Sequence, residues 1–106
     1  MFDFSDKVVV ITGAAGNLGR AAAFAFHEAG AKLALVDRQR DVIKAVFDDD
    51  IPEGEYCYPV AADLMKEDSV AEMANAIHER FGRIDALVNI AGGFTMGPTL
   101  AETPLD

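Results

Sequence analysis

The feature that most constrains the fold is an alternation of short apolar runs with longer amphipathic segments. Four runs rich in β-branched and aliphatic residues read as strands, at positions 7–11, 32–36, 56–61 and 86–90. The segments between them are long enough for the crossovers that parallel strands require. The sequence therefore predicts an α/β fold, in which a doubly wound parallel sheet carries helices on both faces.

The order of the strands follows from the handedness of these crossovers. Right-handed connections and double winding predict the order 3-2-1-4 across the sheet, with strands counted along the chain. The direction of winding changes between the first and the fourth strand. Ligands of such sheets bind beyond the carboxyl ends of the strands at that point, so a functional site is expected there.

Three helices are expected between the strands. The first repeats Leu18, Ala22, Ala25 and Ala29 at helical spacing and closes at Gly30. The second covers 40–47, with an apolar face made by Val42, Ile43, Val46 and Phe47. Ser69 and Glu72 form a capping-box pattern that predicts the start of the third. Its apolar stripe consists of Val70, Met73, Ala74, Ile77 and Phe81, and Gly82 stops it.

Composition limits the kinds of partner. The 106 residues fit one domain, and 18 acidic against 9 basic side chains give a net charge of −9. This balance argues against binding to nucleic acid or to an anionic membrane. No apolar run approaches the ~20 residues of a membrane span, and acidic residues stand where a signal peptide would carry basic ones. A lone Cys57 fits a reducing, cytoplasmic location.

The turn between the first strand and the first helix carries the clearest chemical signal. Gly13, Gly16 and Gly19 follow a G-x-x-G-x-x-G spacing. A diphosphate needs close approach of the backbone, which a Cβ would obstruct, and the free N–H groups of a helix N-terminus. Gly13 suits the tight turn, and Gly19 allows the helix to pack closely. The pattern predicts a Rossmann-type dinucleotide site.

Asp37 ends the second strand, 18 residues after Gly19. A carboxylate at this place can accept hydrogen bonds from both hydroxyls of an adenosine ribose. It could instead be a helix N-cap or a turn aspartate. Arg38, which follows, could pair with a 2′-phosphate, stack on the adenine or point into solvent.

The chain resembles the short-chain dehydrogenases/reductases over essentially its whole length. Four stretches carry the resemblance, in the right order and on the right elements. They are Thr12-Gly13 with Asn17-Leu18-Gly19, Asp63-Leu64 after the third strand, Phe81-Gly82-Arg83-Ile84-Asp85-Ala86-Leu87-Val88, and Asn89-Ile90-Ala91-Gly92 after the fourth strand.

The resemblance implies a set of cofactor contacts. Backbone groups around Asn17 and Leu18 would meet the diphosphate. Asp37 would bind the adenosine ribose and favour NAD over NADP. Further along the chain, Asp63 would face the adenine with Leu64 beside it, Asn89 would brace the central strands, and Ala91 and Gly92 would line the floor under the cofactor. The resemblance also implies a small carbonyl or alcohol substrate and a homo-oligomer for the complete protein.

Two departures from the family pattern matter. Position 17 is Asn where the single-domain branch usually has glycine, and Asn tolerates positive φ better than most residues. The family's Tyr-x-x-x-Lys pair is missing, because Val60 follows Tyr56 and Ala62 follows Tyr58 at the lysine position. We therefore expect residues 1–106 to be the N-terminal, cofactor-binding part of a longer reductase, with no catalytic residue of its own.

Other readings stay open. The chain could be a non-catalytic dinucleotide-binding module, or, from its glycine spacing, part of a nucleotide-sugar epimerase or dehydratase. Cys57 is expected to pack in a strand, because no basic partner is near it in the sequence. His27 and His78 are expected at the surface or its boundary, and no metal site is expected. Phe94 and Met96 could border the nicotinamide and substrate or pack as ordinary loop residues.

Overall fold

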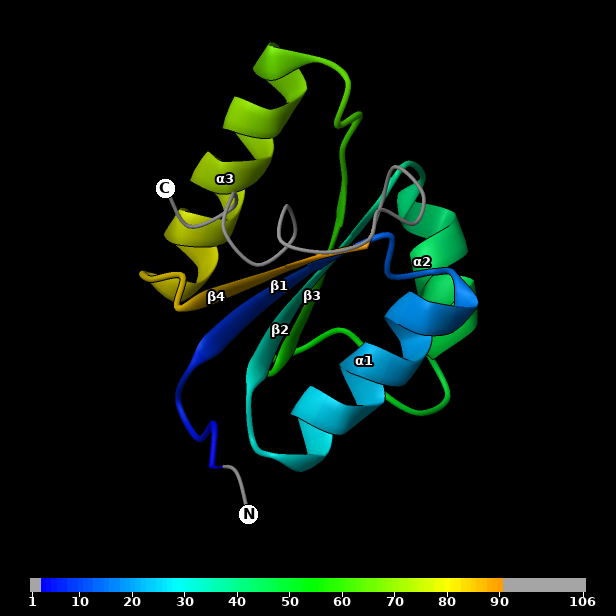
Figure 1. The fold of residues 1–106 in the computed structure, drawn as a ribbon, viewed down its shortest axis with the longest axis vertical. Helices are drawn as coiled ribbons and strands as arrows, with labels where there is room; N and C mark the ends of the chain where they lie inside the picture. Colours follow the sequence, from blue (N-terminus) through cyan, green and yellow to red (C-terminus); the bar gives the residue numbers. More distant parts are fainter. Residues whose placement is uncertain (1–2, 91–106) are drawn as a thin grey trace.

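The predicted sheet is present in the structure, a computed structural model that describes residues 3–90 (Figure 1). Its strands are β1 (Val8–Thr12), β2 (Lys32–Asp37), β3 (Cys57–Ala61) and β4 (Ala86–Asn89). All pair in parallel, in the order β3-β2-β1-β4. The α/β class and the strand order expected from the sequence are both confirmed.

Helices cover both faces of this sheet. They are α1 (Asn17–Glu28), α2 (Arg40–Phe47) and α3 (Glu67–Phe81). Figure 1 shows α1 and α2 on one face and α3 on the other. Alternate residues of β1 therefore enter two separate cores: Val9 and Ile11 pack with the α1–α2 side, and Val8 and Val10 with the α3 side. This explains why residues 8–11 of β1 form an unbroken apolar run.

The buried face of α1 differs from the expected stripe. Gly19 and Ala23 are the buried residues of this helix, whereas Leu18 is 57% exposed. The error is one of phase. The helix turns its smallest side chains toward the sheet because its first turn lies against the preceding loop. On α2, Ile43 and Phe47 are buried as expected, but Val42 is 44% exposed.

The expected capping box at Ser69 is wrong. Helix α3 begins three residues earlier than a Ser69 cap would place it, at Glu67, and its N-cap is Lys66, with no side-chain cap. Glu67 and Asp68 favour this start, because acidic side chains in a first turn interact well with the helix dipole. Gly82 ends the helix at φ 81°, as expected of a glycine cap.

Side-chain contacts fix the start of β4 against β1. The Val8 N–H donates to Asp85 Oδ2 at 2.8 Å, and Arg83 Nη2 donates to Asp85 Oδ1 at 2.7 Å. The Arg83 guanidinium, followed by the Val8 N–H, lowers the pKa of the Asp85 carboxyl. These two hydrogen bonds to Asp85 fix the register of β4 against β1. In that register Thr12 lies beside Asn89, at the other end of the two strands.

Within residues 3–90, no helix is long and apolar enough to cross a membrane. The sheet has an open side edge along β4. Among the described strands, β4 pairs only with β1. An apolar groove of about 280 Å³ lies beside this edge, between α3 and β4, and Ile77, Ile84 and Leu87 contribute to its lining. Such an edge favours pairing with another chain.

We expect the 106-residue chain to self-associate through this groove and edge, giving a mass above that of a monomer in light scattering. Ile84→Glu places a charge on the groove and should lower the associated fraction. Val42→Glu is the matched control, because Val42 and Ile84 are both 44% exposed and Val42 lies on α2. A monodisperse wild-type monomer with an ordinary Tm would contradict this expectation.

Candidate functional site

The carboxyl ends of β1 and β2 meet the N-terminus of α1 at one end of the sheet. This end, at the carboxyl ends of the strands, is called the site edge and is distinct from the open side of β4. The chain leaves β1 through a tight turn at Gly13, whose φ of 72° suits glycine. The Ala14 N–H donates to the Val36 carbonyl at 3.0 Å, and the Gly16 N–H donates to the Gly13 carbonyl at 3.2 Å. These bonds fold the turn back onto the end of β2.

Gly19 permits the close approach of α1 to this turn. A Cβ added at position 19 would lie 2.1 Å from the Gly13 carbonyl oxygen and 2.7 Å from Ala14 Cα. Both are backbone atoms, which cannot move aside without moving the turn. Only glycine therefore fits here, in agreement with the packing role expected from the sequence.

Gly16 is the N-cap of α1, in an extended conformation, and no side chain caps the helix. Asn17 is the first helical residue. The left-handed conformation considered for Asn17 is not adopted, because Asp6 is the only non-glycine residue with positive φ in the described chain. The first turn of α1 contains no acidic side chain. Its N–H groups and the positive end of its dipole are thus suited to an anion.

Asp37 lies beside the turn, where the sequence placed it. Its Oδ2 accepts a hydrogen bond from the Ala15 N–H at 2.9 Å, and its Oδ1 accepts one from the Arg38 N–H at 2.8 Å. The first bond spans 22 residues and joins the end of β2 to the glycine turn. Asp37 is therefore not a helix N-cap, since Gln39 caps α2.

Asp63 follows β3 at the site edge. Its N–H donates to Ser69 Oγ at 2.8 Å, and its Oδ1 accepts from the Met65 N–H at 3.0 Å. Ser69 thus holds the loop before α3 instead of capping the helix. Arg38 Nη2 lies 3.8 Å from Asp63 Oδ2. Leu64 is half-buried against the α3-side core.

Asn89 joins the two central strands at their carboxyl ends. Thr12 Oγ1 donates to Asn89 Oδ1 at 2.7 Å and accepts from the Ile90 N–H at 3.2 Å. Thr12 is the one buried polar residue in the described chain, at 3% exposure. The bond joins the ends of β1 and β4 through side chains, and the part of Thr12 in it was not foreseen. Ala91, Gly92, Phe94 and Met96 lie outside the described residues.

The carboxyl end of the sheet as a whole suits a ligand that carries both negative charge and hydroxyl groups. The glycine turn and the uncapped start of α1 offer backbone N–H groups for phosphate oxygens. The Asp37 carboxylate beside it offers acceptors for hydroxyl groups. A cradle that glycine alone permits, next to such an acceptor, fits the diphosphate and ribose of a dinucleotide.

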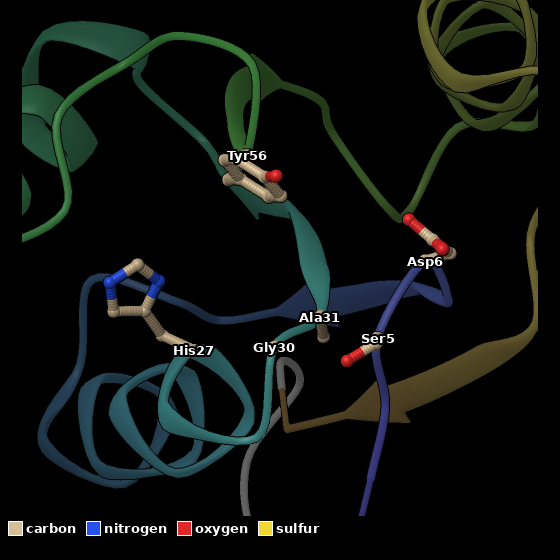
Figure 2. A pocket seen from close by; sticks show the side chains of 6 residues that line it. All are labelled: Ser5, Asp6, His27, Gly30, Ala31 and Tyr56. Atoms are coloured by element: carbon tan, nitrogen blue, oxygen red, sulfur yellow. The ribbon is translucent and has the colours of Figure 1, made fainter.

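A cavity of about 320 Å³ opens at the opposite end of the sheet, where the strands begin (Figure 2). It is lined by Ser5, Asp6, His27, Gly30, Ala31 and Tyr56. These residues precede β1, β2 and β3 or end α1, so the cavity lies at the amino ends of the strands. The His27 Nδ1 atom is buried, and it has no hydrogen-bond partner within residues 3–90.

The remaining reactive side chains, Cys57 and His78, lie away from the glycine turn, in β3 and on α3. Cys57 is 2% exposed in the α1–α2 core. Burial raises the pKa of its thiol to about 11, with help from the Glu53 carboxylate. The thiol is therefore protonated and unreactive at neutral pH, as expected for a packing residue. His78 is exposed on α3. Residues 3–90 hold no cluster of potential metal ligands.

Comparison with known proteins places the chain in a family. The family model for "short chain dehydrogenase" matches residues 7–105. Meso-2,3-butanediol dehydrogenase of Serratia marcescens is 39% identical over 103 residues, which cover 97% of this chain and 40% of that protein. The chain spans about a third to two fifths of the length of the curated relatives it matches.

Two solved structures share the fold closely. The 3-ketoacyl-(acyl-carrier-protein) reductase of Brucella melitensis, complexed with NADH, is 35% identical with a TM-score of 0.72, covering 80% of this chain and 34% of that one. The N-domain of a bacterial malonyl-CoA reductase with NADP is 33% identical with a TM-score of 0.80, covering 88% of this chain and 18% of that one. The chain belongs to the short-chain dehydrogenase family.

Proposed function

We propose that this chain forms the dinucleotide-binding part of an NAD(P)-dependent oxidoreductase, which transfers hydride to or from a carbonyl or alcohol carbon. The observation that carries the proposal is the approach of α1 to the glycine turn, so close that a Cβ at Gly19 would lie 2.1 Å from a backbone oxygen. When bound, the nicotinamide supplies or receives the hydride. The residues of this chain bind and orient the dinucleotide.

Each part of the dinucleotide has an assigned group of residues. The diphosphate lies on the turn and the helix start, where α1 has no side-chain cap. The ribose of the adenosine meets the Asp37 carboxylate. The remaining proposed contacts are Arg38, Asp63 and Leu64 around the adenine, and Asn89, Ala91 and Gly92 under the cofactor.

Asp37 leads us to expect tighter binding of NAD⁺ than of NADP⁺. A 2′-phosphate would lie within a few ångströms of the carboxylate, and repulsion between like charges at ~4 Å is worth roughly 1 kcal/mol in water. That corresponds to about a fivefold difference in Kd. Titration calorimetry with both cofactors measures it. Asp37→Ala should narrow the gap, and equal or tighter binding of NADP⁺ to the wild type would contradict the preference.

Arg38 is the residue that could offset this preference. It lies 3.8 Å from Asp63, and its side chain is 75% exposed. A surface pair of this kind is worth at most about 1 kcal/mol, so a 2′-phosphate could draw Arg38 away from Asp63. Arg38→Ala should therefore weaken NADP⁺ binding more than NAD⁺ binding, which the same titration measures.

The proposal is favoured over the two alternatives. An epimerase rests only on the Gly13, Gly16 and Gly19 spacing, whereas the named relatives are dehydrogenases and reductases. A non-catalytic module would bind the dinucleotide but show no turnover in the complete protein, so an activity assay separates it. We further propose a homo-oligomer and a cytoplasmic location, the latter in keeping with the buried, free thiol of Cys57.

A further inference from the structure

We propose that Asp37 is also a positioning residue for the glycine turn, holding the turn in the shape that receives the diphosphate. This inference rests on the proposed dinucleotide site. It starts from the bond that the Ala15 N–H donates to Asp37 Oδ2 at 2.9 Å. The carboxylate proposed to bind the ribose is thus also hydrogen-bonded to the glycine turn, which is the proposed diphosphate subsite.

The bond holds a part of the turn that other contacts leave out. Before Ala15, the fully buried Ala14 is anchored by its N–H to the Val36 carbonyl. After it, Gly16 bonds back to Gly13, and the helix begins at Asn17 without a side-chain cap. Within residues 3–90, Asp37 makes the one side-chain hydrogen bond found to residues 13–16.

The carboxylate has enough acceptor sites for both tasks. Its two oxygens offer about four lone-pair sites, and the Ala15 and Arg38 N–H groups occupy one on each oxygen. Sites remain for ribose hydroxyls. The two tasks also depend on different properties of Asp37. Its negative charge opposes a 2′-phosphate, while the place of its oxygen holds the turn.

Two substitutions separate these properties. Asp37→Asn and Asp37→Ala both remove the charge, but only the asparagine keeps a carbonyl oxygen that can accept from Ala15. Amide hydrogen exchange measured by NMR on the ligand-free chain reports the bond directly. We expect the Ala15 amide to exchange slowly in the wild type and Asp37→Asn, and about fivefold faster in Asp37→Ala. Arg38→Ala, which keeps its own N–H, is the matched control and should leave Ala15 unchanged.

Inorganic pyrophosphate probes the turn without touching a ribose subsite. We expect it to bind Asp37→Asn about fivefold more tightly than Asp37→Ala in an NMR titration. The amides of Leu33 and Leu35 in β2 verify that each variant is folded. If Asp37→Ala does not fold, Asp37→Ser replaces it, because its shorter side chain does not reach Ala15.

The outcomes separate this inference from the proposed function. Equal Ala15 exchange in Asp37→Asn and Asp37→Ala, with equal pyrophosphate affinity, would overturn the positioning role and leave the ribose role intact. A wild type that binds neither NAD⁺ nor NADP⁺ would overturn the proposed function. In that case the difference in Ala15 exchange still decides whether Asp37 holds the turn.

Discussion

Gly19→Ala is expected to lose dinucleotide binding and to lower the Tm by roughly 12–24 °C, for a destabilisation of about 3 kcal/mol. The added Cβ would lie 2.1 Å from the Gly13 oxygen and 2.7 Å from Ala14 Cα. Because both are backbone atoms, either the turn or α1 must shift, and either shift disrupts the proposed phosphate subsite. Thermal unfolding followed by circular dichroism measures the first effect, and calorimetric titration with NAD⁺ measures the second.

Two other glycines provide the controls. At Gly16 a Cβ would lie 3.6 Å from the Gly13 oxygen, an ordinary contact. Gly16→Ala should therefore cost at most about 1 kcal/mol, as a poorer N-cap, while weakening binding because the added methyl group lies in the turn proposed to hold the diphosphate. A Cβ at Gly54 meets nothing within 4 Å, so Gly54→Ala should change neither. A Gly19→Ala variant as stable as Gly54→Ala would show that α1 does not pack so closely.

The sheet could be predicted from the sequence because its determinants are local. A run such as residues 8–11 of β1, buried on both faces, has to be apolar, and glycines mark where strands and helices end. The phase of α1 could not be predicted by hydrophobicity. Its contact face is set by Gly19 and Ala23, which are small instead of strongly apolar, and Leu18 is left exposed. Closeness of packing decided the face there.

The site was predictable in its position but less so in its contacts. The ends of β1, β2 and β3 place the glycine turn, Asp37 and Asp63 at one edge of the sheet. The bonds Ala15–Asp37 and Thr12–Asn89 link residues 22 and 77 positions apart, and each depends on register and loop geometry. Ser69 was misread for the same reason, since its hydroxyl accepts from Asp63 instead of capping a helix. Side-chain hydrogen bonds between segments that meet at the ends of strands leave no periodic signal in a sequence.

The second large effect concerns turnover. We expect the 106-residue chain to perform no sustained hydride transfer. Reduction of a carbonyl leaves an alkoxide-like oxygen that must be protonated, and general acid catalysis of this kind is typically worth ~10²–10⁴-fold. Orientation of the substrate can contribute roughly 7–11 kcal/mol more. The chain contains no Tyr-x-x-x-Lys sequence to supply the proton.

Neither of its two tyrosines can take that part. Tyr58 lies in β3 and packs edge-on to Phe81, with ring centroids 6.4 Å apart, while the Arg80 guanidinium lies 5.1 Å from the centre of its ring. Tyr56 lines the cavity at the amino ends of the strands (Figure 2). The glycine turn lies at the carboxyl ends, and a five-residue strand is roughly 17 Å long. Tyr56 is thus separated from the site by the length of a strand. Tyr58 lies level with Ala34 of β2 and Val10 of β1, and β2 separates it from β1 and the glycine turn.

The assay incubates the 106-residue chain with NADH and a panel of ketones and 3-oxoacyl thioesters, and follows the absorbance of the reduced nicotinamide. We expect no sustained loss of absorbance. A longer chain that carries a serine and a Tyr-x-x-x-Lys pair after residue 106 should restore it. Gly13→Val is the control, because a β-branched residue cannot adopt the φ of 72° that the turn needs. Sustained turnover by the 106 residues, abolished by Gly13→Val, would show that the chain holds a proton donor of its own. Such a donor would have to lie at the carboxyl ends of the strands, where the dinucleotide is proposed to bind.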